Sequence, residues 1–516
     1  MPTAPAQPLE SAPLIELLRS DLIAARFTVP ALGALWGAEA DAALERGNRV
    51  PAERALSRRT TPLGTLASLF VLGSPVARDA AEAALASLTL EGARRLGLVE
   101  EHGDRVTALV DLRPYDFLDA QGAGSWWIAS DLGELATGRE LRPDHVLGVG
   151  GASLTLSGLL LPDPVATVLD LGTGCGIQAM HASRWADRVV ATDISSRALE
   201  LARFNAVLNG IEGIDFRLGS LYEPVAGERF DRIVSNPPFV ITPRAPGVPE
   251  YEYRDGGLVG DALIEQVVAG AAEHLVPGGI AQLLGNWEYR ADVDGLQRAA
   301  GWADEAGLDA WIIERERQDP SQYAETWIRD GGTRPGSADF ERLCGAWLDD
   351  FDARGVTGVG FGYLLLRHPD PAAPSMRGRM RRVERLDAPL GRGTAGLGTH
   401  LSTALAAADW QAVRSDAELL AARLQVAGDV TEERSHWPGE ADPSVLVLRQ
   451  GGGFRREVRV GTELAAIVGA CDGELGLGVI VTAVAQLLDL DVAELERSTV
   501  AEVRELLIDG MLLPGS

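Results

Sequence analysis

Apolar residues recur at helical spacing through the first part of this chain. The pattern is clear in Leu14–Leu18 and again in Leu66–Phe70. A later helical segment ends in Leu-Gly-Leu-Val99, and after a His-Gly-Asp-Arg turn the run Val106–Val110 is typical of a strand. This order predicts a mostly helical, winged-helix-like domain over residues 1–115. Such modules bind DNA, form dimers or dock substrates, and this one has no arginine-rich recognition helix.

The pattern changes between residues 116 and 370, where short β-rich runs alternate with helical segments. Strands separated by helices predict an α/β fold with a doubly wound, mainly parallel sheet of the Rossmann-like type. The last run follows another candidate strand, Gly355–Val359, and is a candidate for a terminal antiparallel strand. The predicted strands are Val165–Leu169, Val189–Thr192, Ile214–Leu218, Ile233–Ser235, Gly279–Leu284, Ala310–Glu314 and Gly360–Leu366.

A proline-rich segment, Pro369–Pro374, marks a second boundary. The region after it, residues 376–516, has β-like pieces followed by helical segments, which predicts an α+β, winged-helix-like accessory domain. It begins with a basic run, Arg377–Arg385, for which two interpretations stay open: a solvated hinge, or a contact with RNA or an acidic partner. The predicted strands and helices are Ser444–Leu448, Glu457–Val460, Thr462–Cys471, Leu477–Leu488 and Val500–Asp509.

Length and composition fit a protein of several globular domains. A chain of 516 residues has room for about three of them. Hydrophobic residues make up 46% of the chain and charged residues 23%, which is ordinary for globular proteins. The sequence has no uncharged apolar stretch of about 18 residues and no signal-peptide pattern at its start. We therefore expect neither a membrane span nor secretion.

Cysteine usage and net charge narrow the function classes. The three cysteines, Cys175, Cys344 and Cys471, lie far apart in sequence and form no cluster with the seven histidines. The sequence thus predicts neither a disulfide framework nor a metal site, and a reducing cytoplasm is the expected location. With a net charge of −27, most of the surface is expected to repel nucleic acid. Any such contact therefore needs a local basic patch.

A glycine-rich loop follows the first strand of the predicted α/β domain. It reads G-x-G-x-G at Gly172, Gly174 and Gly176, with Asp170 before it, and such glycines let backbone turn sharply and lie close to a ligand. The loop is expected at the carboxyl edge of the sheet, where Asp193 ends the next strand and can accept hydrogen bonds from both hydroxyls of a ribose. The spacing differs from the G-x-G-x-x-G of dinucleotide sites, which disfavours a nicotinamide enzyme.

This arrangement resembles the cofactor motifs of class I methyltransferases. The resemblance implies S-adenosyl-L-methionine as cofactor, bound by the loop and by the two carboxylates that flank it. It also implies a residue near the adenine, where many relatives carry an acid. This chain has Ser220 in that region, and a serine is a weaker acceptor.

A second motif, Asn236-Pro-Pro-Phe239, ends the fourth predicted strand. It resembles the N-P-P-[FY] motif of amino-methyltransferases, which include release-factor glutamine methyltransferases, ribosomal-RNA guanine methyltransferases and adenine-N6 enzymes. The resemblance implies that the Asn236 side-chain oxygen and the Pro237 carbonyl accept the two hydrogens of a planar NH2 group, while Phe239 stacks on it. Asn236 is then also expected to border the cofactor. Such catalysis rests on positioning and electrostatic stabilisation, without a metal.

The residues after this motif bring the chain nearer to one family. The segments Asn-Pro-Pro-Phe-Val-Ile-Thr242 and Arg254-Asp-Gly-Gly257 are similar to the corresponding segments of release-factor glutamine methyltransferases, in the small methyltransferase-domain family. The resemblance covers roughly residues 145–290. Trp126 and Trp127, outside it, are expected to pack in a core rather than to wall a substrate site.

Three functions fit these observations. The favoured one is methylation of a protein glutamine in a release-factor-like partner, in keeping with the acidic surface. The first alternative is methylation of an exocyclic base amine in RNA, such as rRNA or tRNA, or in DNA, with Arg377–Arg385 as the contact. The second is a non-catalytic binding protein with a degenerate methyltransferase core, which the intact Asp170, Asp193 and Asn236 disfavour.

Overall fold

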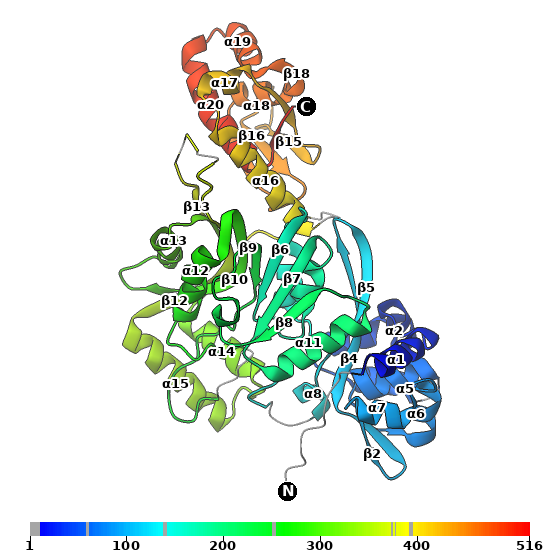
Figure 1. Ribbon diagram of the computed structural model, residues 1–516. Coiled ribbons are helices and arrows are strands. Elements are labelled where there is room, and N and C mark those ends of the chain that lie inside the picture. The colour runs from blue at the N-terminus through cyan, green and yellow to red at the C-terminus, as the bar shows by residue number, and fades with distance from the viewer. Residues whose placement is uncertain are drawn as a thin grey trace.

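The computed structural model describes residues 11–57, 61–137, 142–249, 254–372, 375–376, 378–391 and 396–515. A central α/β layer carries a helical N-terminal unit on one side and a smaller C-terminal unit at the opposite end (Figure 1). Within the described residues, no helix is both long enough and apolar enough to cross a membrane.

The N-terminal unit combines helices with a small antiparallel sheet in the order β1-β3-β2. Each helix is short and buries one apolar side, and helix α2 is capped by the Thr28 hydroxyl, which accepts from the Ala31 N–H. The winged-helix character of this unit stays a prediction. Its elements are α1 (Ala12–Ala24), α2 (Val29–Trp36), α3 (Ala38–Glu45), α4 (Val50–Leu56), α5 (Pro62–Leu66), the π-helical turn η1 (Ala67–Val71), β1 (Val76–Ala77), α6 (Arg78–Ala84), α7 (Thr89–Arg95), β2 (Val99–His102) and β3 (Arg105–Ala108).

A long hairpin, β4 (Val110–Asp119) and β5 (Gly122–Asp131), ties this unit to the central layer. The Asn205 side-chain oxygen accepts a hydrogen bond from the Ala129 N–H at 2.7 Å, and its amide nitrogen donates to the Ala129 carbonyl at 2.9 Å. One hydrophobic core runs from the N-terminal helices into the central layer without a break. Strand β4 therefore crosses the boundary predicted at residue 115.

Trp126 of this hairpin packs in the core, as predicted, and Trp127 packs against that core while partly buried. The Trp126 ring lies in the core, 4.3 Å from the Phe117 ring centroid and 4.8 Å from that of His181. The Trp127 indole donates to the Phe27 carbonyl at 2.7 Å. Both rings are thus used to join the hairpin to its neighbours.

The central sheet has eight strands in the order β13-β11-β12-β10-β9-β6-β7-β8. All neighbours are parallel except β12, which is antiparallel to both β10 and β11. The predicted α/β sheet is confirmed. The two candidate strands around residues 355–366 form a single strand, which is antiparallel, as predicted for the second of them. The strands are β6 (Val165–Leu171), β7 (Ala186–Asp193), β8 (Ile214–Leu218), β9 (Phe230–Ser235), β10 (Leu275–Arg290), β11 (Asp309–Gln318), β12 (Val356–Arg367) and β13 (Arg381–Arg385).

The basic run is not a solvated hinge, and its contact with RNA or an acidic partner stays a prediction. Most of its described part is strand β13, at the edge of the sheet and parallel to β11, so the sheet continues past the predicted boundary at residue 370. Its arginines are engaged in ion pairs, which leaves little net positive charge for a nucleic acid; Arg377 lies outside the described residues. The pairs are Arg381 with Asp304, Arg382 with Asp509, and Arg385 with Asp294 and Glu314.

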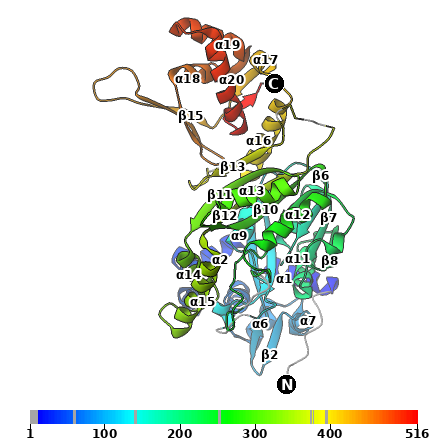
Figure 2. The ribbon, with the colours of Figure 1, turned by 90° about the vertical axis from the view of Figure 1, so that its left-hand side faces the viewer.

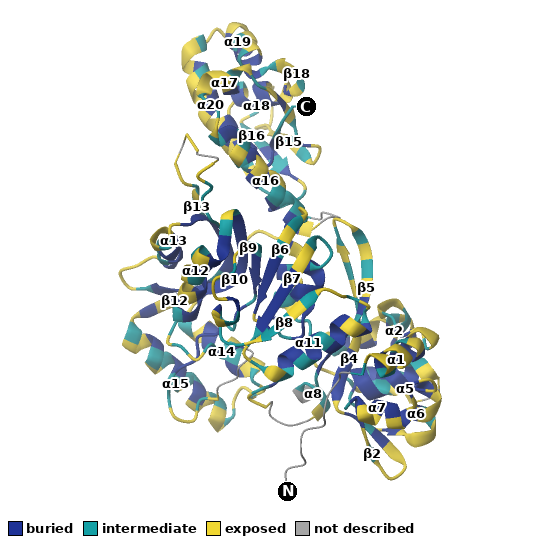
Figure 3. Ribbon diagram, in the orientation of Figure 1, coloured by how far each residue is buried: buried dark blue, intermediate teal, exposed yellow. Residues whose placement is uncertain are grey.

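Helices cover both faces of the sheet, and the strands between them are buried (Figure 3). Apolar residues of α12 and α13 pack with side chains such as Leu169 and Ile233, while α9 and α16 pack with the alternate positions of the neighbouring strands, such as Ile280 and Ile313. The helices are α8 (Glu134–Thr137), α9 (Gly151–Leu159), α10 (Ile177–Ala182), α11 (Ser196–Leu208), the 3-10 turn η2 (Glu223–Val225), α12 (Ala262–His274), α13 (Gly295–Glu305), α14 (Pro320–Asp330) and α15 (Ala338–Arg354).

The C-terminal unit has its own core and two small antiparallel sheets, β18-β14-β19 and β15-β16-β17. The first of its helices, α16, reaches down onto the central sheet, and the β15–β16 hairpin projects to one side (Figure 2). Its winged-helix character also stays a prediction. The elements are α16 (Gly396–Ala412), α17 (Asp416–Ala421), β14 (Arg423–Val426), β15 (Val430–Ser435), β16 (Val445–Gln450), β17 (Glu457–Val460), α18 (Thr462–Gly469), β18 (Asp472–Gly476), α19 (Leu477–Leu488), α20 (Val492–Ile508) and β19 (Leu512–Pro514).

Candidate active site

The carboxyl ends of four parallel strands surround a cavity of about 480 Å³. Strands β6, β7, β8 and β9 are neighbours in the sheet, so the residues that follow each strand meet at one edge. They contribute Gly172, Asp193, Ser220 and Asn236 to the cavity wall. The sequence motifs that lie far apart in the chain are thus brought together at one site.

The glycine loop is held by the next strand. The N–H groups of Gly172 and Thr173 both donate to the Thr192 carbonyl at 2.9 Å. Gly172, Gly174 and Gly176 all have positive φ angles, of 74°, 55° and 89°, a region that other residues rarely adopt. Gly172 and Gly174 line the cavity, whereas a Cβ at Gly176 would lie 2.9 Å from the Cβ of Ala202. The third glycine therefore allows close packing on α11.

Asp170 lies beneath the loop rather than in the described wall of the cavity. Its side chain is fully buried and accepts from the Thr173 hydroxyl at 2.5 Å and from the Ala179 N–H at 2.9 Å. Burial raises the pKa of this carboxyl to about 7, against the lowering effect of these two hydrogen bonds. The predicted cofactor ligand thus fixes the shape of the loop and the start of α10.

Asp193 lines the cavity and links the loop to the strand that carries it. One carboxylate oxygen accepts from the Gly174 N–H at 2.8 Å and the other from the Ser195 N–H at 2.9 Å. Burial raises the pKa of Asp193, and the hydrogen bonds from Ser195, Gly174 and Ile194 oppose that shift. A carboxylate has about four acceptor positions, so these bonds within the chain do not use all of them.

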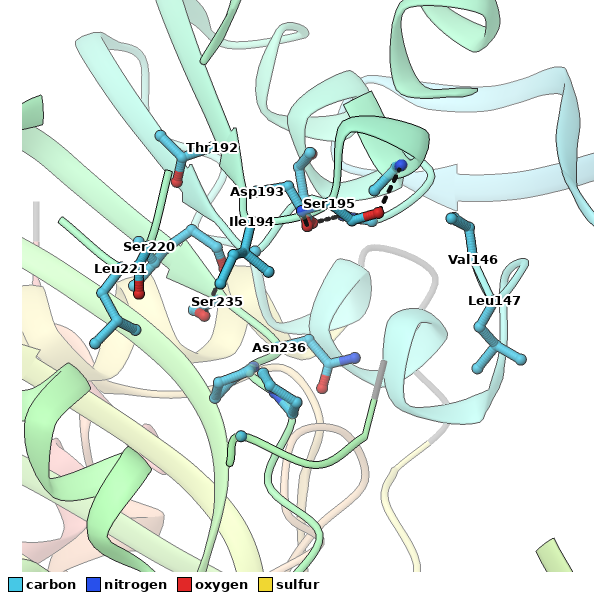
Figure 4. Close-up of a pocket in the computed structure, with 18 of the residues that line it drawn as sticks. Val146, Leu147, Thr192, Asp193, Ile194, Ser195, Ser220, Leu221, Ser235 and Asn236 are labelled. Atoms are coloured by element: carbon cyan, nitrogen blue, oxygen red, sulfur yellow. Dashed lines mark hydrogen bonds between the residues drawn. The ribbon is translucent and has the colours of Figure 1, made fainter. Parts of the chain in front are cut away.

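The loop after β8 has a constrained backbone. Gly219 has a φ of 154°, and a Cβ there would lie 2.5 Å from the ring of Pro224. Leu221 has a φ of 46°, which is rare for a residue with a side chain. Ser220 lies between them in the cavity wall, and Figure 4 shows it on the same side as Leu221. The backbone thus fixes where the Ser220 hydroxyl can reach.

Asn236 follows β9 and forms the opposite side of the cavity from Asp193 (Figure 4). Its side-chain oxygen is buried, and no donor in the described part of the chain reaches it. An unpaired buried amide oxygen is costly, so this atom is a candidate acceptor for a ligand. Ser235 just before it donates to the Leu171 carbonyl at 2.7 Å, which ties the motif to the base of the glycine loop.

Pro237 lines the cavity beside Asn236, but Phe239 points elsewhere. The Phe239 ring makes edge contacts with Trp327, at a centroid distance of 6.2 Å, and with Phe361, at 6.3 Å. It belongs to the wall of a small neighbouring cavity rather than to the described wall of the large one. Its stacking on a planar substrate therefore stays a prediction.

Several wall residues carry no sequence motif and were missed. The segment His145–Gly148, before α9, forms one side of the cavity, and Gln266 and Leu263 of α12 form another part. Only the fold brings them to the strand ends. No group of three or more potential metal ligands occurs among the described residues.

Comparison with known proteins places these motifs in a family. Residues 150–293, which hold the glycine loop, Asp193 and the Asn-Pro-Pro-Phe sequence, match the model of the methyltransferase small domain. This part of the chain is a methyltransferase small domain. The cofactor of such domains is S-adenosylmethionine, as predicted. Residues 24–109 and 403–514 match two domains of unknown function, DUF7059 and DUF7782.

The methyltransferase region is similar to enzymes that are named for glutamine methylation. The release factor glutamine methyltransferase of Xylella fastidiosa (strain Temecula1) is 40% identical over 144 residues, which are 26% of this chain and 52% of that protein. The ribosomal protein uL3 glutamine methyltransferase of Bradyrhizobium diazoefficiens is 35% identical over 152 residues, 27% of this chain and 46% of that protein. The chain spans about half the length of the curated relatives it matches.

Solved structures overlap with the same part of the chain. A ribosomal protein L11 methylase from Lactobacillus delbrueckii subsp. bulgaricus overlaps with 43% of this chain and 81% of its own chain, at 20% identity and a TM-score of 0.25. The family match and the strand order, rather than this likeness, carry the assignment of the domain.

Proposed function

We propose that this chain transfers a methyl group from S-adenosylmethionine to the nitrogen of a planar amide, with a glutamine of a release-factor-like protein as the favoured substrate. One observation carries the proposal: Asn236, whose buried side-chain oxygen has no donor among the described residues, lines the same cavity as the glycine loop and Asp193. A cofactor and an NH2 group are both accommodated by such an arrangement.

The residues present fit the cofactor. A cavity of about 480 Å³ lies within the range of about 300 to 1,000 Å³ for small-molecule sites. We infer that Asp193 accepts from the ribose hydroxyls with its remaining acceptor positions, that Gly172 and Gly174 let backbone approach the ligand, and that Ser220 bonds near the adenine. Asp170 and Gly176 act indirectly in this proposal, since they shape the loop and pack it on α11.

Asn236 and Pro237 are the proposed catalytic residues. When bound, S-adenosylmethionine supplies an activated methyl group. An amide nitrogen is a poor nucleophile because its lone pair is delocalised. We infer that the Asn236 oxygen and the Pro237 carbonyl accept its two hydrogens, which orients the nitrogen and stabilises the positive charge that develops on it. Phe239 supports the motif loop from behind, through Trp327 and Phe361.

A protein substrate is favoured over a nucleic acid. The similar proteins are named for glutamine methylation of a release factor and of ribosomal protein uL3. The basic run, which was the expected contact for RNA, is paired with acids in the sheet and in the C-terminal unit. With a net charge of −27, the chain offers little attraction for phosphates.

The flanking units are proposed to be accessory domains. We infer an N-terminal domain that ends near residue 115 in the hairpin, a methyltransferase domain that includes strand β13, and a C-terminal domain that begins after it. The order α5, β1, α6, α7, β2, β3 supports a winged-helix-like N-terminal domain.

A methyl-transfer assay with the purified full chain tests this function. The chain is incubated with methyl-labelled S-adenosylmethionine and a purified bacterial peptide-chain release factor, with a bulk RNA sample in parallel. We expect label in the release factor, and mass spectrometry should place one added methyl on a glutamine. Label in the RNA alone would replace this function by base methylation, and label in neither would overturn it.

A further inference from the structure

A second cavity, of about 330 Å³, lies directly beside the first, between the N-terminal unit and the methyltransferase domain. The two cavities share residues of one wall, His145, Leu147 and Gly148. We propose that this second cavity receives an uncharged apolar side chain of the protein substrate, close in its sequence to the residue that is methylated. The inference rests on the proposed function and adds where the substrate chain binds.

The cavity is lined by both parts of the molecule. The N-terminal side gives Leu72, after η1, and Ile128 of β5, while the methyltransferase side gives Val149 and Leu154. Residues of the two sides are far apart in sequence and meet only because the β4–β5 hairpin lies against the central layer. A substrate held here therefore touches both the N-terminal unit and the methyltransferase domain.

Two leucines of this wall are half exposed. Leu147 and Leu154 each have 50% of their surface accessible. Covering apolar surface is favourable by about 25 cal/mol per Å², so an apolar group that enters the cavity gains from both. Leu147 lies on the shared wall and Figure 4 shows its side chain beside the first cavity, so an occupant of the second cavity lies next to the site of transfer.

The charged groups of this cavity are already neutralised. The Arg113 Nε group donates to both oxygens of Asp111, at 2.8 and 2.9 Å, and its Nη2 group donates to the Val71 carbonyl at 3.1 Å. An ion pair that is satisfied in this way offers no net charge to a ligand. A charged side chain that entered would lose its hydration without gaining a partner, so the cavity favours an uncharged apolar one.

The shared wall is fixed relative to the hairpin. The Asp131 N–H donates to the Val146 carbonyl at 3.0 Å, and the Asp131 side chain accepts from the Val146 N–H at 2.9 Å. Arg197 of α11 donates to the same carboxylate at 3.0 Å. The spacing between the two cavities is therefore set by the fold. A substrate fits both only if its apolar side chain and its glutamine are separated by that same spacing.

The test changes the cavity without touching the first one. Leu154 lines only the second cavity of the two and is half exposed on α9, so Leu154→Asp places a charge in the cavity at little cost to the core. Steady-state rates are measured with the purified release factor, and cofactor affinity is measured by calorimetry. We expect KM for the release factor to rise at least tenfold, with cofactor affinity unchanged. Leu118→Asp is the matched control. Leu118 lies on strand β4 and is 56% exposed but is in neither described cavity wall, so this variant should keep the wild-type KM.

The outcomes are distinct. If the wild-type chain methylates no release factor, the proposed function fails, and the inference with it. If the wild-type chain does methylate it and Leu154→Asp leaves KM unchanged, the inference alone is wrong. A photo-crosslinking residue at position 154 gives a second readout that needs no turnover: attachment to the release factor supports the inference, and attachment to none of the added protein contradicts it.

Discussion

The hydroxyl of Tyr323 accepts a hydrogen bond from the N–H of Ile241 at 2.9 Å, and this bond holds the chain just after the Asn-Pro-Pro-Phe motif. Tyr323 lies on α14 and is fully buried, and the Asn286 side chain of β10 donates to the same oxygen at 2.9 Å. A helix between the sixth and seventh strands of the sheet in chain order thus positions the motif from behind.

Tyr323→Phe should lower kcat while KM and cofactor affinity stay near the wild-type values. The change removes the acceptor for two buried donors, at a cost of about 1 to 3 kcal/mol, and it frees the motif loop to shift. We expect a loss of roughly tenfold in kcat. Tyr289→Phe is the control: its hydroxyl donates to the buried Glu314, and neither residue is in the described cavity wall, so the variant should lose stability without the change in kcat. Equal kcat in both variants would contradict a positioning role.

Local sequence predicted which residues meet at the glycine-loop side of the cavity better than at the side of the Asn-Pro-Pro-Phe motif. The glycine loop and Asp193 follow directly from two neighbouring strands, so strand order alone brings them together. Phe239 lies outside the described wall of the large cavity, and the sequence could not indicate this because its ring packs on Trp327 and Phe361, which come from later elements. Tyr323 carries no motif and was left unassigned, since its role exists only when α14 packs beneath the loop.

Asp193→Ala should weaken the binding of S-adenosylmethionine. The proposed loss is that of charge-assisted hydrogen bonds to the ribose, which are worth about 1.5 to 3 kcal/mol each, so Kd is expected to rise at least tenfold. Calorimetric titration measures this directly. Asp187→Ala is the control, because Asp187 is exposed at the other end of the same strand. An unchanged Kd in the Asp193 variant would remove this residue from the cofactor site.

Asn236→Ala should abolish most methyl transfer while the cofactor still binds. The variant removes the buried oxygen that the proposal assigns to the target NH2 group, and the loss of one such preorganised group typically costs about 100-fold or more in kcat. Asn236→Asp keeps an acceptor of the same size and should recover part of the rate. Single-turnover transfer with labelled cofactor separates chemistry from binding. Full activity of the alanine variant would refute the proposed grip on the nitrogen.

The strand formed by the basic run was missed because its charges mask its pattern. Arg381–Arg385 has no apolar alternation, yet it pairs with β11, since acids on neighbouring elements neutralise its arginines. Glu384 lies at the centre of this network: Arg456 of the C-terminal unit donates to it at 2.8 and 2.6 Å, and the Trp311 indole donates at 2.6 Å. Burial opposes ionisation, but these partners lower the pKa of Glu384.

Glu384→Gln should destabilise the junction between the sheet and the C-terminal unit. It removes one of the two carboxylates that the largely buried Arg382 and Arg456 share, while Asp509 stays paired with both. We therefore expect a loss below the about 3 to 5 kcal/mol of a fully broken buried pair. Calorimetry should show a lower unfolding temperature, and limited proteolysis should release the C-terminal unit sooner. Glu433→Gln, which breaks the exposed pair with Arg449, should cost less than about 1 kcal/mol. Equal effects would argue against a junction held by Glu384.

Asp170 should make the stability of the protein fall as pH rises. Burial raises the pKa of Asp170 from 3.8 to about 7, so between those values the native state holds a proton that the unfolded state has released. The native state is therefore favoured most below about pH 4, and that advantage is lost progressively up to about pH 7.

Asp170→Asn removes this titration and tests it. Urea unfolding of both proteins from pH 4 to pH 8 gives the difference in unfolding free energy, wild type minus variant. We expect the difference to fall by up to roughly 4 kcal/mol between pH 4 and pH 7, since each pKa unit corresponds to about 1.4 kcal/mol, and then to level off. Asp187→Asn, at an exposed position, should give a difference without this fall. Parallel curves for wild type and Asp170→Asn would mean that the carboxyl is ionised in the native loop, held by the Thr173 hydroxyl and the Ala179 N–H alone.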